Sequence, residues 1–114
     1  MQKIVINTEF GGFNLSDKAV ELYGQLAQLN LVSEIDRYGF RNYYCDSISD
    51  DNYFSSYNIK RNDPHLVQTV EQLGEAAWGQ YAQLKVVEIP DDVEWQLNEY
   101  DGLEHVAEKH RTWS

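Results

Sequence analysis

The chain has 114 residues and a formal net charge of −10, from 19 Asp and Glu against 9 Lys and Arg. An acidic surface repels phosphate, so nucleic-acid binding that depends on phosphate contacts is not expected. Apolar residues at 42% and aromatic residues at 13% suffice for a folded core and exceed what a disordered acidic chain carries. We therefore predict a single domain over residues 1–114.

Cellular location follows from the cysteine content and from hydropathy. Cys45 is the only cysteine, so the chain forms no internal disulfide, which suits a reducing cytosol. Residues 1–10 lack the long apolar core of a signal peptide, and no apolar run approaches the roughly 20 residues that cross a bilayer. We expect a cytoplasmic protein without membrane contact.

The N-terminal third predicts a strand and a helix. The β-branched run Ile4-Val5-Ile6 predicts a strand over residues 3–7, which Gly11-Gly12 then interrupts. Ser16 is a good N-cap, with Asp17 in the first turn and Leu15 and Val20 placed to form a hydrophobic staple. The expected apolar face of this helix, ending near Asn30, consists of Ala19, Leu22, Tyr23, Leu26 and Leu29.

The middle third is rich in aromatics and contains a second helix start. One or two short strands are expected near residues 40–45 and 53–60, joined by a polar loop over 47–52. Asp63-Pro64 predicts a helix start, with Asp as the cap and Pro at the first helical position. Gly74 either ends this helix or loosens it before an extension to Gly79.

The C-terminal third predicts strands. Residues 84–89 form a β-branched run that Pro90 stops, and apolar residues then alternate with polar ones from Val93 to Leu97. Asp101-Gly102 favours a two-residue hairpin turn, with residues 103–113 as the returning strand. The alternative is a short helix with Leu103, Val106, Ala107 and His110 on one face, and we favour the hairpin.

These elements predict an α+β fold. We expect a single domain with a mainly antiparallel sheet of four or five strands and two helices packed on one face. The other face of the sheet would be left to solvent or to a partner.

Residues 86–108 contain eight carboxylates and no Lys or Arg. An ordinary solvated face mixes both signs of charge, so this one-sided stretch indicates a surface that binds a basic protein, with a face that serves only solubility as the alternative. The carboxylates expected to meet the partner are Asp91, Asp92, Glu94, Glu99, Asp101 and Glu104. Apolar anchors would come from the aromatic segment through Tyr53, Phe54 and Tyr57, although part of that segment is needed for the core.

A second candidate site would hold a small ligand. The Gly11-Gly12 turn before a helix exposes backbone N–H groups, and basic and aromatic side chains gather near the C-terminus. The residues of this alternative site are Gly11, Gly12, Lys109, His110, Arg111 and Trp113. A tight turn and cross-strand pairing with acidic neighbours also account for these residues.

Metal and nucleophilic chemistry have little support. His105 and His110 would point to opposite faces of one strand, and no zinc or calcium motif includes them or His65. Acidic neighbours weaken Cys45 as a nucleophile. We expect no cofactor, no metal and no catalytic residue.

Several phrases of the sequence resemble a family of small uncharacterised proteins of tailed phages and prophages. These phrases are residues 4–7, 10–16, 61–64, 84–95 and 108–113. The resemblance carries over no catalytic residue. It implies a phage or prophage accessory protein in a bacterial cytoplasm, a class that includes inhibitors of CRISPR effectors and other host defences.

The leading hypothesis is therefore a non-enzymatic inhibitor that binds a basic bacterial host protein. The alternatives are a binder of small molecules or nucleotide signals, or an enzyme acting on them, and a structural or regulatory phage protein.

Overall fold

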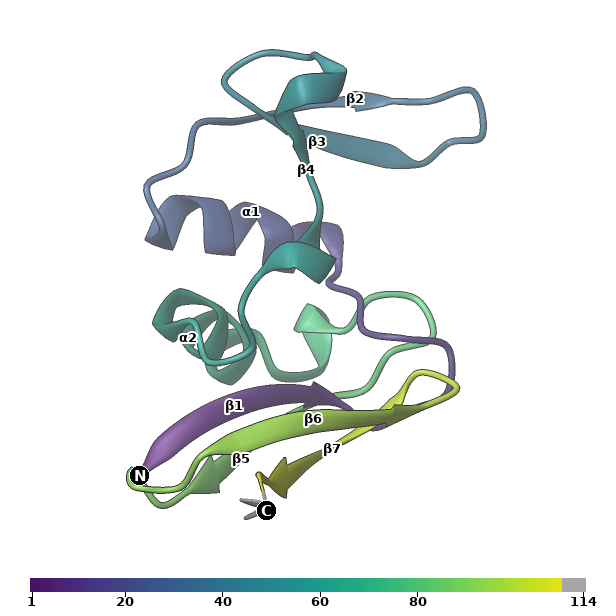
Figure 1. Cartoon of the computed structure of the whole chain (residues 1–114). Helices are drawn as coiled ribbons and strands as arrows, with labels where there is room; N and C mark the ends of the chain where they lie inside the picture. The colour runs from purple at the N-terminus through teal and green to yellow at the C-terminus, as the bar shows by residue number, and fades with distance from the viewer. Residues whose placement is uncertain (110–114) are drawn as a thin grey trace.

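The computed structural model describes residues 1–109 and shows an α+β protein (Figure 1). Its helices and strands are β1 (Gln2–Asn7), α1 (Asp17–Leu26), β2 (Leu31–Ile35), β3 (Arg41–Cys45), β4 (Tyr53–Phe54), α2 (Pro64–Leu73), β5 (Leu84–Ile89), β6 (Trp95–Tyr100) and β7 (Leu103–Glu108). Three short 3-10 turns, η1 (Asp50–Asn52), η2 (Ser56–Asn58) and η3 (Gly74–Ala77), complete the element order. No helix within residues 1–109 is both long and apolar enough to span a membrane.

The strands are all antiparallel, but they form three small sheets where we expected one sheet of four or five strands. β1 pairs with β5, β6 pairs with β7, and β2, β3 and β4 form the third sheet. The edge of β1 that could have continued the sheet has other partners. The carbonyl of Arg61 accepts a hydrogen bond from Val5 N–H at 2.8 Å, and the carboxylate of Glu104 accepts one from Asn7 N–H at 2.8 Å.

The two helices form a middle layer and do not cover one face of a single sheet. In Figure 1 the β2–β3–β4 sheet lies beyond α1 at one end of the molecule, and β1, β5, β6 and β7 lie beyond α2 at the other end. The longest dimension is 51 Å, against 32 Å and 29 Å for the other two. The end with β2–β3–β4 and the end with the β6–β7 hairpin are therefore well separated.

Both predicted helix starts are confirmed. The side chain of Ser16 accepts a hydrogen bond from Ala19 N–H at 3.1 Å, which caps α1. Asp63 caps α2 by accepting from His65 N–H at 2.8 Å, and Pro64 occupies the first turn, where its missing N–H costs nothing. Gly74 ends α2 with a φ of 57°, and η3 continues to Ala77 as a 3-10 turn.

The buried face of α1 differs from the predicted one. It consists of Ala19, Val20, Tyr23 and Gly24, whereas Leu22 and Leu26 are only half-buried and Leu29 is exposed. Gly24 explains why this face of α1 is the buried one. Leu31 packs directly against it, and a Cβ at residue 24 would lie 2.6 Å from Leu31 Cδ1. The helix ends at Leu26, before the predicted Asn30, and Gln28 takes a φ of 58°.

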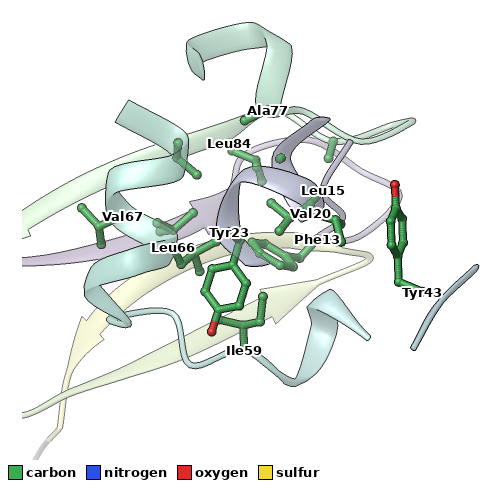
Figure 2. Packing of buried hydrophobic residues seen from close by; sticks show 14 residues of the cluster. Phe13, Leu15, Val20, Tyr23, Tyr43, Ile59, Leu66, Val67, Ala77 and Leu84 are labelled. Atoms are coloured by element: carbon green, nitrogen blue, oxygen red, sulfur yellow. The ribbon is translucent and has the colours of Figure 1, made fainter. Parts of the chain in front are cut away.

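The core lies between α1, α2 and the β1–β5 pair. Figure 2 shows Phe13, Leu15, Val20 and Tyr23 packed together, with Leu66 of α2 and Leu84 of β5 in the same cluster. Leu66 and Ala77 have no exposed surface. Residues from loops, both helices and the three strands β1, β3 and β5 thus contribute to one continuous core.

The middle third contains one strand more than expected. β3 confirms the strand near residues 40–45, but β2 was missed, and β4 spans only two of the residues in 53–60. The remainder of that range includes η2 and the buried Ile59. Side-chain alternation is hard to detect in β2, because three of its five residues are half-buried and the last two are exposed.

The C-terminal hairpin is confirmed, and the helical alternative is wrong. Asp101 has a φ of 49° and Gly102 a φ of 88°, so both turn residues take the positive φ that a type I′ turn requires. β6 and β7 pair in register from Trp95 with Glu108 to Tyr100 with Leu103. Residues 110–113 of the predicted strand lie outside the described residues.

Candidate protein-interaction site

Five of the six predicted acidic contact residues are exposed along the β6–β7 hairpin and the turn before it. Asp91 and Asp92 lie in the turn between β5 and β6, and Glu94 directly precedes β6. Glu99 and Asp101 lie at the opposite end, next to the hairpin turn. No Lys or Arg lies on the hairpin itself, so the field along its length has one sign.

These exposed carboxylates have few internal cationic partners among residues 1–109. The N-terminal ammonium approaches Asp91 Oδ2 at 3.3 Å, with both groups more than half exposed. Lys3 Nζ bonds Glu71 at 2.9 Å and lies 3.9 Å from Glu88. Exposed pairs of this kind are screened and weak, so the acidic hairpin remains available to an external cation.

Glu104 is the exception, and its assignment to the exposed acidic surface is wrong. Only 6% of Glu104 is exposed, and its carboxylate forms a buried ion pair with Arg61. The same oxygen, Oε1, accepts the hydrogen bond from Asn7 N–H. Glu99 lies directly opposite Glu104 in the hairpin but stays exposed. Glu104 therefore attaches the hairpin to the domain and is not part of the exposed acidic surface.

The buried ion pair belongs to a polar network that sequence reasoning missed. The Arg61 guanidinium stacks over the Phe13 ring, 3.6 Å from its centroid. Asn7, also fully buried, donates through Nδ2 to the carbonyls of Glu9 and Gly102, each at 2.7 Å, and accepts from Gln83 N–H at 3.0 Å. The network therefore connects β1, β5 and the hairpin turn through satisfied polar groups.

The glycine pair at residues 11 and 12 also helps to attach the β6–β7 hairpin to the rest of the protein. Gly11 N–H donates to the carbonyl of Asp101 at 3.3 Å. A Cβ on Gly102 would collide with the backbone of Gly12 and would lie 2.9 Å from Gly11 N. The turn thus packs backbone to backbone against the hairpin, which gives the glycines a structural reason independent of a ligand.

Three exposed aromatics flank this junction and were not among the predicted anchors. Phe10 is 55% exposed, and Tyr81 and Tyr100 are each 72% exposed. Phe10 adjoins Gly11 and Tyr100 adjoins Asp101, while a Cβ on Gly11 would lie 2.9 Å from Tyr81 Cβ. We call Phe10, Tyr81, Tyr100, Glu99 and Asp101 the hairpin-tip surface.

The predicted aromatic anchors lie elsewhere. Tyr53 and Phe54 form β4, at the end of the molecule opposite the hairpin (Figure 1). Phe54 is half-buried and packs 6.0 Å from the Tyr23 ring, and Tyr53 packs edge-on against Tyr44 at 5.7 Å. Only Tyr57, exposed and 5.9 Å from the Arg61 guanidinium, lies near the hairpin network.

The alternative ligand site is not assembled by the described residues. Lys109 is exposed and its N–H bonds the Glu94 carbonyl at 2.9 Å, near the base of the hairpin, whereas Gly11 and Gly12 meet its turn. His110, Arg111 and Trp113 lie outside the described residues. Within residues 1–109 no three His, Cys, Asp or Glu side chains gather in a way that could hold a metal ion.

A half-open cleft of about 400 Å³ separates the β2–β3–β4 sheet from the start of α1. Asn14, Arg41, Tyr43 and Trp78 are among its lining residues. The Tyr43 hydroxyl is buried and has no hydrogen-bond partner among the described residues. Burial, followed by the negative charges of Asp17 and Glu21, raises the pKa of Tyr43 to about 12, so this hydroxyl stays protonated at neutral pH.

Comparison with known proteins adds no relative. No family model matches the chain, and no curated protein and no solved structure matches it either.

Proposed function

We propose that this protein is a non-enzymatic binding protein that docks on a basic surface of a bacterial host protein and inhibits it. The observation that supports the proposal most directly is the hairpin-tip surface, where exposed aromatics adjoin carboxylates on a hairpin without Lys or Arg. The resemblance to phage and prophage proteins suggests the bacterial cytoplasm as the place and a defence system such as a CRISPR effector as the target.

The acidic residues would contribute orientation and speed of association. Five exposed carboxylates, Asp91, Asp92, Glu94, Glu99 and Asp101, run from the base of the hairpin to its tip. Exposed charges act over a screening length of about 8 Å at physiological salt, so their attraction accelerates encounter with a basic surface. A row of carboxylates along a hairpin also imitates a phosphate backbone, which suits a nucleic-acid channel of the partner.

The aromatics would contribute the desolvated contacts. Binding energy in protein interfaces concentrates in a few buried aromatic or Arg anchors, and Tyr offers contact area at low entropic cost. Tyr81 and Tyr100 are the most exposed aromatics near the hairpin, and both can stack on Arg side chains of a basic partner. These anchors replace Tyr53 and Phe54, which lie at the other end of the molecule.

The charge test compares two variants with the same change in charge. Partners are first captured from bacterial lysate at low salt, and affinity is then measured by biolayer interferometry at two salt concentrations. Glu99→Lys/Asp101→Asn alters the hairpin tip, while Asp50→Lys/Asp51→Asn makes the same change on the exposed η1 turn at the other end. We expect the tip variant alone to slow association and to lose salt dependence.

A second variant separates the base of the hairpin from its tip. Asp91→Lys/Asp92→Lys/Glu94→Lys should weaken association through charge alone, because none of the three aromatics of the hairpin-tip surface lies at the base. Tyr100→Ala should weaken binding by about tenfold or more, as expected for an anchor worth at least about 1.4 kcal/mol. Tyr38→Ala, at a residue 74% exposed on the opposite end, is its control.

The proposal would be contradicted if Glu99→Lys/Asp101→Asn, Asp91→Lys/Asp92→Lys/Glu94→Lys and Tyr100→Ala all bind the partner as tightly as the parent does. The acidic hairpin would then serve solubility only.

A further inference from the structure

We propose that two copies of this chain associate through the free edge of β2, in an antiparallel pairing centred on Ser33. β2 is an edge strand, since its partner within the described residues is β3 alone. Exposed edges present unpaired N–H and C=O groups that another strand can use. This surface is separate from the hairpin-tip surface, so the proposal does not depend on the proposed function.

The register of β2 with β3 determines which backbone groups face outward. Asp36 N–H donates to Phe40 C=O at 2.9 Å, and Asp46 N–H donates to Asn30 C=O at 2.7 Å, just beyond each end of the pair. Hydrogen-bonded pairs alternate along an antiparallel ladder, so the even-numbered residues of β2 face β3. The N–H and C=O groups of Leu31, Ser33 and Ile35 therefore point away from the sheet.

These three residues are spaced for self-pairing. With Ser33 opposite Ser33 of the second copy, Leu31 lies opposite Ile35 on both sides of the two-fold axis. All three outward-facing residues then form hydrogen-bonded pairs with their counterparts. The pairing also covers Ile35, which is 60% exposed, and joins two three-stranded sheets into one of six strands.

Side-chain charge is compatible with this register. Glu34 falls opposite Val32 of the second copy, so no carboxylate faces another directly across the strands. β2 contains no Pro and no Lys, the residues that commonly protect an edge from pairing. Glu34 is its only charged residue.

Charge also permits a second copy at this edge. Residues 31–45, which form β2, β3 and the loop between them, contain two acids, Glu34 and Asp36, and two bases, Arg37 and Arg41, so the paired strands carry no net charge, and Asp46, Asp50 and Asp51 follow them. The acidic hairpin lies at the far end of a molecule 51 Å long, several screening lengths away. Two copies that meet at β2 therefore keep their strongest negative fields apart.

The first test is the mass in solution. Sedimentation equilibrium from micromolar to millimolar concentration should show the 13.3 kDa parent converting to a species of twice that mass. Ser33→Lys places like charges opposite each other at the axis and should return the chain to monomer. Asn58→Lys, on the exposed η2 turn, adds the same charge away from the edge and should leave the dimer intact.

The second test checks the register by cross-linking, in a Cys45→Ser background. Ser33→Cys puts two thiols in a directly opposed pair with Cα atoms about 5.5 Å apart, within disulfide range. Glu34→Cys places the two cysteines on a diagonal, with Cα atoms about 7–8 Å apart, which is beyond disulfide range. Residue 34 is nevertheless more exposed than residue 33. Mild oxidation should cross-link only the first variant.

Three results would overturn the proposal: a parent that stays monomeric at millimolar concentration, a dimer that Ser33→Lys leaves unchanged, or equal cross-linking of both cysteine variants. If β2 pairs instead with a strand of another protein, this chain stays monomeric by itself, which is the first of these results. Melting temperatures of all variants establish that each is folded.

Discussion

The guanidinium of Arg61 lies between the carboxylate of Glu104 and the face of the Phe13 ring. Both charged side chains are at least nine-tenths buried, and 43 residues separate them in the sequence. A buried charge is tolerated only when it is paired and hydrogen-bonded, and here each partner meets that need for the other. This contact attaches the C-terminal hairpin to the domain.

Removing the charge of Glu104 should therefore destabilise the protein strongly. Glu104→Gln leaves the buried guanidinium without its counter-charge, and we expect a loss of about 3–5 kcal/mol in the free energy of unfolding, measured in urea. Glu99→Gln, on the exposed residue directly opposite, should change it by less than about 0.5 kcal/mol. Equal effects of the two substitutions would mean that the ion pair does not hold the hairpin.

A comparison of two glycines tests how closely the hairpin turn packs. Gly39 and Gly102 have nearly the same φ, 85° and 88°, but a Cβ meets nothing within 4 Å at Gly39 and collides with the Gly12 backbone at Gly102. Gly39→Ala should cost about 1–3 kcal/mol through backbone strain alone. Gly102→Ala should cost clearly more by thermal or urea unfolding, and equal costs would contradict the close backbone contact.

Two buried tyrosines should respond oppositely to loss of the hydroxyl. Tyr23 donates to Asp63 Oδ2 at 2.8 Å, so Tyr23→Phe should destabilise the protein by about 1.5–3 kcal/mol, as for a hydrogen bond to a charged group. Tyr43 has no partner among the described residues, so Tyr43→Phe should be neutral or stabilising at pH 7. Urea unfolding of both variants at pH 7 measures the contrast.

The same tyrosines predict a loss of stability in alkali. Burial, followed by the hydrogen bond to Asp63 and the charge of Asp63, raises the pKa of Tyr23 to about 12, and burial, followed by the charges of Asp17 and Glu21, raises the pKa of Tyr43 to about 12. The unfolded pKa is about 10, so the folded state holds these protons more tightly. Ionisation therefore costs the folded state nothing below pH 10, and stability falls as the pH rises from 10 toward 12. Tyr43→Phe should show a shallower loss.

The corrected face of α1 can be checked by truncating leucines. Leu66→Ala, at a residue with no exposed surface, should cost about 2–5 kcal/mol. Leu26→Ala, at a half-buried position, should cost less than Leu66→Ala. A cost for Leu26→Ala as large as for Leu66→Ala would restore the predicted face.

The cap of α1 can be tested separately. Ser16→Ala should cost about 1 kcal/mol, because it removes the cap and also the hydrogen bond to the Ala76 carbonyl at 2.6 Å.

The features predicted correctly from sequence are those that neighbouring residues determine. Ser16 and Asp63-Pro64 start helices, and Asp101-Gly102 makes a hairpin turn, because each depends on the φ preference or capping group of one or two residues. The missed features depend on tertiary packing. Glu99 and Glu104 face each other across the hairpin, and only Glu104 meets distant partners, Arg61 and the N–H of Asn7, that hold it in a buried position.

The proposed interaction surface is visible in the sequence only in part, for the same reason. The acidic character of the hairpin is visible in the sequence, because its carboxylates are consecutive along one segment. The aromatics of the hairpin-tip surface come from three distant segments, around Phe10, Tyr81 and Tyr100, and only the packing of the glycine turn on the hairpin brings these segments together. The crowded aromatics of residues 38–57 were the more visible signal, and Tyr53 and Phe54 among them lie at the other end of the molecule from the hairpin.

The pairing of β1 with β5 has a consequence for folding during synthesis. Gln2 pairs with Ile89 and Asn7 with Leu84, so the first strand of the chain has no sheet partner until most of the chain has been made. At about 5–20 residues per second, the 82 residues between Asn7 and Ile89 take about 4–16 s to translate. The apolar run Ile4-Val5-Ile6 stays unpaired in the nascent chain throughout that interval. The core therefore cannot be completed before residue 84 and those after it have been made, and chain termination before residue 84 leaves an unpaired β-branched strand exposed to aggregation.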